Sequence, residues 1–204
     1  MSNRSSNSSS SNDTLGDGSA LIIVDMQNDF MPGGSLPVPE ADKIIPVVNK
    51  YIEIFMAKGL PIFASRDWHP PNHISFRQRG GIWPVHCVRN TFGAKFHPDL
   101  KLPRSATVVS KATDPNREAY SAFDRTELAD MLRAKGIKRL FVAGVATDYC
   151  VKNTVLDALG HGFEVILLED ATKGLTNSTA AIEEMKSKGV KVIRLEQLIT
   201  VRNR

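Results

Sequence analysis

The sequence is poor in cysteine and lacks any long apolar run. Only two of its 204 residues are cysteine, Cys87 and Cys150, which is too few for a disulfide framework. Because the N-terminus carries no apolar signal region, we expect free thiols and a cytoplasmic location. No apolar stretch approaches the roughly 18 residues that a membrane-spanning helix requires, so we expect no membrane span.

The basic surplus lacks the pattern of a nucleic-acid-binding surface. The formal net charge is +4, from 26 basic and 22 acidic residues. Most basic residues are scattered, and one cluster without interleaved aromatic residues lies near the C-terminus: Lys186, Lys188, Lys191 and Arg194. Such a cluster is typical of a solvated face, so we expect no nucleic-acid partner. The sequence leaves open whether the chain forms a homo-oligomer.

The first 18 residues have almost nothing to bury. Seven of the first twelve are serine and three are asparagine. Such a segment cannot gain enough by packing to offset the entropy that it would lose on ordering. Residues 1–18 are therefore predicted to be a disordered tail, and residues 19–204 to form a single domain with a sizeable core.

Beyond the tail, short apolar runs alternate with segments of helical periodicity. Runs without polar alternation are typical of parallel strands covered on both faces, and the alternation with helices indicates right-handed crossovers. We expect an α/β fold with three layers, α/β/α, around a mostly parallel six-stranded sheet. The expected strands are 20–24, 61–65, 106–110, 140–143, 163–168 and 190–194, and the expected helices are 41–58, 127–135, from 150 onward, and 178–188.

The first four expected strands each end in a group capable of chemistry. Asp25 follows the first, Asp67 and His69 the second, Lys111 the third, and Cys150 lies just past the fourth. Because the carboxyl ends of parallel strands meet at one edge of a sheet, we expect these groups to share a site. Residues 70–104 show no periodicity, and a loop of that length is usually functional.

Cys150 follows a buried strand and a short turn, in what should be the first turn of a helix. Thr147 or Asp148 could cap that helix. The helix N-terminus and the Lys111 ammonium would favour a thiolate, and Asp25 could take the thiol proton. This pattern indicates nucleophilic catalysis, with a buried structural cysteine as the alternative.

A second group of residues fits a metal site. Asp67 and His69 alternate on an extended segment, so their side chains share a face. With His86 from the long loop they make three ligands, as in open sites for Zn²⁺ or a similar ion. His73 is a rival ligand whose other role would be to hydrogen-bond the loop, and Cys87 is better explained as a packed thiol.

Several motifs together resemble the nicotinamidases of the isochorismatase-like cysteine hydrolase superfamily. The resemblance spans Ala20 to Arg194, and its motifs are IIVDMQNDF, RDWHP with HISF, WPVHC, SKATDPNREAYSAF and AGVATDYCV. It implies hydrolysis of nicotinamide to nicotinic acid and ammonia through a Cys150 thioester, in NAD salvage, with pyrazinamide as a further substrate. It also implies one divalent ion per chain, Zn²⁺ first, with Mn²⁺ or Fe²⁺ as alternatives.

The resemblance also assigns roles to residues. It implies a cis peptide bond between Val145 and Ala146. Some relatives carry a further metal ligand where this chain has Ser75 or Gln78, so a fourth protein ligand is not expected here. The implied roles are catalysis by Asp25, Lys111 and Cys150, an oxyanion hole from the N–H groups of Ala146 and Cys150, substrate binding by Phe30, Trp83 and Tyr120, and metal binding by Asp67, His69 and His86.

Three alternatives remain at this stage. A carbamoyl-amide hydrolase of the same superfamily would keep the cysteine but should lack the DWH and WPVHC ligands. An isochorismatase would lack the cysteine, and Cys150 argues against it. A catalytically inactive binding or scaffold protein on the same fold belongs to a different functional class, and an assay for ammonia release would exclude it.

Overall fold

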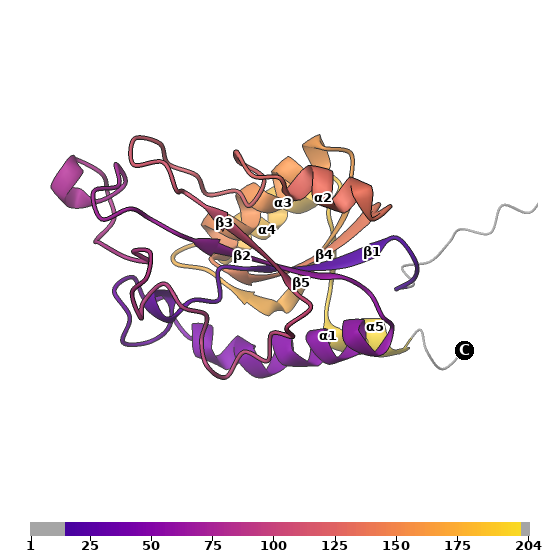
Figure 1. Cartoon of the computed structure of the whole chain (residues 1–204). Coiled ribbons are helices and arrows are strands. Elements are labelled where there is room, and N and C mark those ends of the chain that lie inside the picture. Colours follow the sequence, from indigo (N-terminus) through magenta and orange to yellow (C-terminus); the bar gives the residue numbers. More distant parts are fainter. Residues whose placement is uncertain (1–14, 201–204) are drawn as a thin grey trace, which may run out of the picture.

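The structure, a computed structural model, describes residues 15–200 (Figure 1). The predicted disorder of residues 1–14 lies outside the described residues. Residues 15–18, the end of the predicted tail, pack on the domain: Leu15 is buried, and the N–H of Ser19 donates to the carbonyl of Gly16. The described domain therefore begins four residues before the predicted boundary.

Six strands form one sheet in which every pair is parallel, as predicted. The strand order is β3-β2-β1-β4-β5-β6, so the chain builds one half of the sheet outward from β1 and then the other half from β4. The strands are β1 (Ser19–Val24), β2 (Ile62–Asp67), β3 (Thr107–Lys111), β4 (Arg139–Val145), β5 (Glu164–Lys173) and β6 (Lys191–Ile193).

Helices cover both faces of the sheet and complete the predicted three layers. In Figure 1, α1 (Ile45–Ala57) and α5 (Leu195–Thr200) lie below the sheet. The opposite face carries α2 (Leu128–Ala134), α3 (Lys152–Gly160) and α4 (Ser178–Ser187). Each face has its own apolar core, because alternate residues of β1 and β4 point to opposite sides. Within the described part of the chain, no helix is both long and apolar enough to cross a membrane.

Some boundaries differ from the predicted ones. The predicted helix 41–58 is a 3₁₀ turn, Ala41–Ile44, followed by α1, with Pro46 in the first turn where its missing N–H costs nothing. β5 continues to Lys173, five residues past its predicted end, because its polar end still pairs with β4. The six-residue helix α5 was not predicted, since so short a segment shows little periodicity.

Gly144 lets β4 pass unusually close to β1. Its φ is +116°, and a Cβ there would lie 2.1 Å from the carbonyl oxygen of Val24. Only glycine fits this position without moving the neighbouring strand. Asp25 follows β1, and the turn with Cys150 follows β4. The close approach of the two strands brings both to the same point of the sheet edge.

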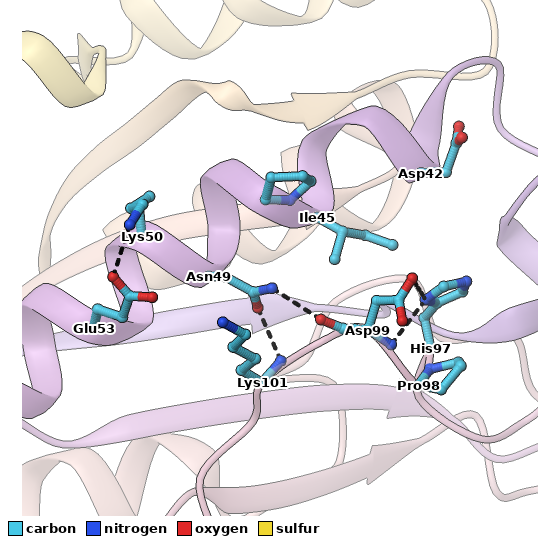
Figure 2. Close-up of a pocket in the computed structure, with 10 residues that line it drawn as sticks. Asp42, Ile45, Asn49, Lys50, Glu53, His97, Pro98, Asp99 and Lys101 are labelled. Carbon is cyan, nitrogen blue, oxygen red and sulfur yellow. Dashed lines mark hydrogen bonds and ion pairs between the residues drawn. The ribbon is translucent and has the colours of Figure 1, made fainter.

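The long segment between β2 and β3 contains only a 3₁₀ turn, Arg77–Arg79, among its described elements, and is tied down by side chains. Asn49 of α1 makes one such attachment, shown in Figure 2. Its amide donates to the carbonyl of Asp99 at 2.8 Å and accepts from the N–H of Lys101 at 2.9 Å. The loop therefore returns to β3 along α1.

Candidate active site

Four side chains meet at the carboxyl edge of the sheet. Nζ of Lys111, at the end of β3, lies 2.5 Å from Oδ1 of Asp67 and 2.9 Å from Oδ2 of Asp25. The same nitrogen lies 3.4 Å from Sγ of Cys150. All four residues are buried. The structure thus brings together the four strand-end groups, with Lys111 at the centre.

Burial and charge oppose each other in this cluster. Burial acts to lower the pKa of Lys111, but Asp25 and Asp67 raise it well above the usual lysine value. Burial is the largest single effect on Asp67 and acts to raise its pKa, but the lowering effects, that of Lys111 first, together outweigh burial and the pKa is lowered. For Asp25 burial prevails and the pKa is raised. The cluster therefore holds one fixed cation, one fixed anion and a carboxyl group, Asp25, suited to exchange a proton.

The thiol of Cys150 is neutral in this environment. Burial raises its pKa well above the usual cysteine value; Lys111 acts to lower it, and Asp25 to raise it. The predicted stabilisation of a thiolate by Lys111 is present but smaller than the effect of burial. A proton must therefore leave the thiol as it reacts. Asp25 has a carboxylate oxygen within 4.8 Å of Sγ of Cys150, and it is the base within reach.

A serine in β2 holds the Asp25 carboxyl group. The hydroxyl of Ser65 donates to Oδ1 of Asp25 at 2.7 Å. Asp25 itself has a φ of +50°, and its carbonyl accepts from the N–H of Gln27 at 2.7 Å, so the chain turns sharply as it leaves β1. Sequence reasoning missed Ser65, because one serine in an apolar strand carries no signal for such a contact.

The turn that carries Cys150 differs from the predicted one. A π-helical turn, Thr147–Val151, precedes α3, in place of an α-helix that begins at Cys150. The predicted cap is wrong: the N-cap is Ala146, and no side chain caps the turn. The Asp148 carboxylate instead accepts hydrogen bonds from the segment 175–177.

A pocket opens over Cys150 and contains most of the predicted site residues. Ala146 lines it, directly after a cis peptide bond with Val145, so the bond implied by the resemblance is present. Asp25 and Lys111 lie outside the lining residues. The lining consists of Phe30, Leu36, Asp67, His69, Trp83, His86, Glu118, Tyr120, Ala146, Tyr149, Cys150 and Leu175.

Three aromatic residues form one wall of this pocket. The indole N–H of Trp83 donates to the hydroxyl of Tyr120 at 3.0 Å. The ring of Tyr149 packs edge-on against Trp83, with centroids 5.0 Å apart, and lies 5.6 Å from Tyr120. Sequence reasoning found the first two and missed Tyr149, although its place beside Cys150 was a usable signal. Leu36 and Leu175 are single aliphatic residues in loops, and the sequence carried no signal that they line the pocket.

The three predicted metal ligands also come together. One donor atom from each of Asp67, His69 and His86 lies within 4.8 Å of the others. Nδ1 of His69 is 3.0 Å from the carbonyl of His86, and Nδ1 of His86 is 2.8 Å from that of Pro84, which leaves both Nε2 atoms for a ligand. Burial lowers the pKa of His69 to about 4, so this ring is neutral near pH 7. The donor set fits a divalent metal ion.

The rival ligands have other partners. Nδ1 of His73 pairs with the hydroxyl of Ser75 at 2.7 Å, and its Nε2 donates to the carbonyl of Arg117 at 2.9 Å, which matches the predicted loop-binding role. His73 also forms a donor group with His69 and Glu118, but its ring nitrogens are already engaged. Gln78 is exposed and donates to a backbone carbonyl.

Two residues of the DMQNDF motif support the metal donors. Gln27 donates to the carbonyl of Asp67 at 2.8 Å and accepts from its N–H at 2.8 Å. The Asp29 carboxylate accepts from the N–H of Cys87 at 2.7 Å, next to His86. Both contacts hold the backbone of a predicted metal ligand or of its neighbour. Sequence reasoning used this motif only for family resemblance and missed these roles.

A second hollow lies between α1 and residues 97–101 (Figure 2). It contains none of the predicted site residues. Its polar side chains form pairs such as Lys50 with Glu53, 3.0 Å apart, and His97 with Asp99, 4.0 Å apart. The predicted nucleophile and metal donors therefore line the pocket over Cys150 and not this hollow.

Comparisons with known proteins identify the family of this chain. The nicotinamidase of Escherichia coli (strain K12) is 40% identical over 201 residues, covering 86% of this chain and 94% of that protein. The pyrazinamidase of Pyrococcus horikoshii in complex with zinc is 60% identical with a TM-score of 0.85, covering 87% of this chain and 99% of that one. PnC1 from L. infantum in complex with nicotinate is 37% identical with a TM-score of 0.83, covering 91% of this chain and 96% of that one. The family model of the isochorismatase domain matches residues 19–197, and the chain therefore belongs to the isochorismatase family.

Proposed function

We propose that the chain is a nicotinamidase, an amidohydrolase that converts nicotinamide to nicotinic acid and ammonia. The observation that carries this proposal is the placement of Cys150, with Asp25 and Lys111, in one site with the Asp67, His69 and His86 donors. A nucleophile beside a base suits amide cleavage, and a metal site suits a ring nitrogen. The relatives named nicotinamidase and pyrazinamidase support the same chemistry. Pyrazinamide is the second proposed substrate, and nicotinic acid would enter NAD salvage.

The metal proposed for the site is one divalent ion per chain, held by Asp67, His69 and His86. Zn²⁺ is the first candidate for this oxygen and nitrogen set, and Mn²⁺ and Fe²⁺ are the alternatives. When bound, the ion supplies a Lewis-acid contact for the ring nitrogen of the substrate and so orients its carboxamide. Phe30 and Trp83, which line the pocket, would enclose the ring.

The first half of the reaction acylates the enzyme. The Asp25 carboxylate accepts the thiol proton of Cys150, and the sulfur attacks the carboxamide carbon. The N–H groups of Ala146 and Cys150 stabilise the resulting oxyanion, an effect worth about 3–4 kcal/mol per donor. Asp25 then gives its proton to the departing nitrogen, the C–N bond breaks, and ammonia and a thioester are formed.

The second half releases the acid. A water molecule attacks the thioester carbon while the Asp25 carboxylate accepts its proton. The C–S bond breaks, nicotinic acid leaves, and the proton returns from Asp25 to Cys150. Lys111 keeps its charge throughout, because the two carboxylates raise its pKa well above the usual value. Its ammonium group limits the charge that builds up when the thiol ionises.

Ammonia release from nicotinamide, with and without a chelator, tests the proposed function. We expect ammonia and nicotinic acid in equal amounts, loss of activity with chelator, and recovery when Zn²⁺ is restored. Full activity in the chelator, together with a preference for carbamoyl amides, would favour the carbamoyl-amide hydrolase reading. A complete lack of ammonia from the metal-loaded protein would favour an inactive binding protein.

Replacing His86 with alanine should remove the metal ion without disturbing Lys111. Replacing Asp67 would not separate the two effects, because Asp67 is hydrogen-bonded to Lys111. We expect metal content below about a tenth of an ion per chain and a weaker affinity for nicotinamide, because one of three ligands is lost. The affinity for benzamide, which has no ring nitrogen, should change less. Metal analysis and inhibition constants measure both effects, with His97→Ala as the histidine control outside the pocket. Equal losses for the two amides would contradict a metal contact to the ring.

Replacing Cys87 with serine should leave the metal in place. The thiol is buried, and among the described residues it belongs to none of the groups whose donor atoms lie within 4.8 Å of one another. Its N–H bond to Asp29 is a backbone contact that serine retains. We expect close to one ion per chain by elemental analysis and substantial activity. A metal-free Cys87→Ser protein would show that the ligand set includes this sulfur.

A further inference from the structure

Asp148 connects two segments of the site that are far apart in sequence. It lies in the turn between Ala146 and Cys150, and its carboxylate faces the segment 174–177 that joins β5 to α4. Oδ1 accepts the N–H of Leu175 at 2.9 Å. Oδ2 accepts three hydrogen bonds, from the N–H of Thr176 at 2.8 Å, the hydroxyl of Thr176 at 2.7 Å and the N–H of Asn177 at 3.1 Å.

These four contacts require an ionised acid. All of them are donors aimed at two oxygens, and asparagine would place an N–H₂ group opposite one set of them. Partial burial acts to raise the pKa of Asp148, but the hydrogen bonds from Thr176, Leu175 and Asn177 outweigh it and hold the pKa below the usual value. The carboxylate is therefore charged near neutral pH, and its bonds to the segment are charge-assisted.

The clamped segment carries part of the pocket wall. Leu175 lines the pocket over Cys150, whereas Asp148 does not. The packing here is tight: a Cβ on Gly174 would lie 2.3 Å from the hydroxyl of Ser178 and 2.9 Å from Oδ1 of Asp148. Asn177, the last residue of the segment, caps α4 by accepting from the N–H of Ala180 at 3.0 Å. The position of Leu175 is thus set between the Asp148 carboxylate and the start of α4.

The geometry points to Asp148 as a positioning residue that clamps residues 174–177 against the catalytic turn and so fixes Leu175 as a wall of the substrate pocket. Its effect on substrate rests on the proposed function. Its effect on the segment does not. As a lining residue, Leu175 would contact the substrate equally in the ground state and the transition state, so its displacement should weaken binding without changing the chemical steps.

The experiment compares Asp148→Asn, Leu175→Ala and the double variant with wild type. We expect Asp148→Asn to raise KM for nicotinamide about tenfold with kcat within about twofold, and Leu175→Ala to act in the same direction. The double variant should be no worse than the more affected single variant, because both remove the same contact. Additive effects, or a fall in kcat with an unchanged KM, would overturn the proposal.

A control and a second readout separate this role from a purely structural one. Asp170 also ties segments together, accepting from the Tyr51 hydroxyl at 2.9 Å and from the N–H of Leu195 at 3.0 Å, but it lies outside the pocket lining. Asp170→Asn should lower the melting temperature and leave KM unchanged. Hydrogen exchange of residues 175–177 should speed up in Asp148→Asn and not in Asp170→Asn. Unchanged hydrogen exchange in Asp148→Asn would overturn the proposed clamp, whatever the activity of the wild-type protein. A wild-type protein that is inactive on nicotinamide would refute the proposed function and leave the clamp standing.

Discussion

Replacing Cys150 with alanine is expected to lower kcat for nicotinamide by at least about a thousandfold, because the variant has no nucleophile to form the thioester. The fold should be retained, since alanine removes one buried sulfur and leaves the Lys111 pairs with Asp25 and Asp67 intact. Metal content should also stay at the wild-type level, because Sγ is not in the proposed ligand set. Single-turnover ammonia release and elemental analysis measure these two quantities. Activity above about a thousandth of wild type would contradict attack by sulfur.

Pyridine-3-carboxaldehyde provides a second measurement on the same variant. The aldehyde keeps the ring nitrogen and the carbonyl of nicotinamide but has no amine to expel. The Cys150 sulfur should add to it and stop at a thiohemiacetal, which resembles the tetrahedral intermediate and should bind far more tightly than nicotinamide. Cys150→Ala should lose most of this gain, and inhibition of wild type should reverse on dilution. Equal inhibition of both proteins would show that the sulfur forms no bond to the aldehyde.

Replacing Lys111 with methionine is expected to give the largest loss of stability, about 3–5 kcal/mol in the free energy of unfolding. The ammonium lies between two buried carboxyl groups, and its removal leaves Asp25 and Asp67 without their cation. Urea unfolding of the metal-free protein at pH 7 measures the loss, because no ion then balances the charge of Asp67. Lys173→Met is the matched control: its pair with Glu40, 3.2 Å apart, is exposed to water, so its loss should lower the stability far less. A comparable loss in both variants would contradict a special role for burial.

The same variant should respond to pH in a predictable direction. In wild type the folded-state pKa of Asp67 is lowered, so its contribution is present above its unfolded pKa and is lost as the pH falls through the folded value. Without Lys111, burial should raise the pKa of both carboxyl groups above their unfolded values, so acid relieves the penalty. The stability gap between wild type and Lys111→Met should therefore narrow from pH 7 toward about pH 4, near the unfolded value. A constant gap across this range would mean that the carboxyl groups do not cause the loss.

The placement of the chemistry was predictable from residue types at strand ends. Asp25, Asp67, Lys111 and Cys150 each follow an apolar run, and the structure gathers the other three around the Lys111 amine. This inference works because all the carboxyl ends of a parallel sheet fall on one edge. The resemblance added the cis peptide bond and the pocket aromatics, which no local pattern indicates.

The contacts that hold these groups were not predictable. Ser65 reaches Asp25 only because the β1–β2 register places it beside Val24. Gln27 clamps Asp67, 40 positions away in the chain. Asp148 was predicted to cap its own helix, but its carboxylate accepts hydrogen bonds from residues 27 to 29 positions away. In each case the partner is chosen by packing and not by sequence spacing.

The sequence by itself determined the alternation of strands and helices, the edge at which reactive groups collect, and the donor set for a metal, because periodicity and residue chemistry are local properties of the chain. The tertiary structure alone decided that Cys150 rests as a neutral thiol, that burial raises the pKa of Asp25, and that Asp148 accepts a hydrogen bond from Leu175 of the pocket wall. The reason is physical. A pKa depends on how far burial removes water and which charges remain nearby, and a long-range hydrogen bond depends on which segments pack together, so both are decided only when the chain has folded.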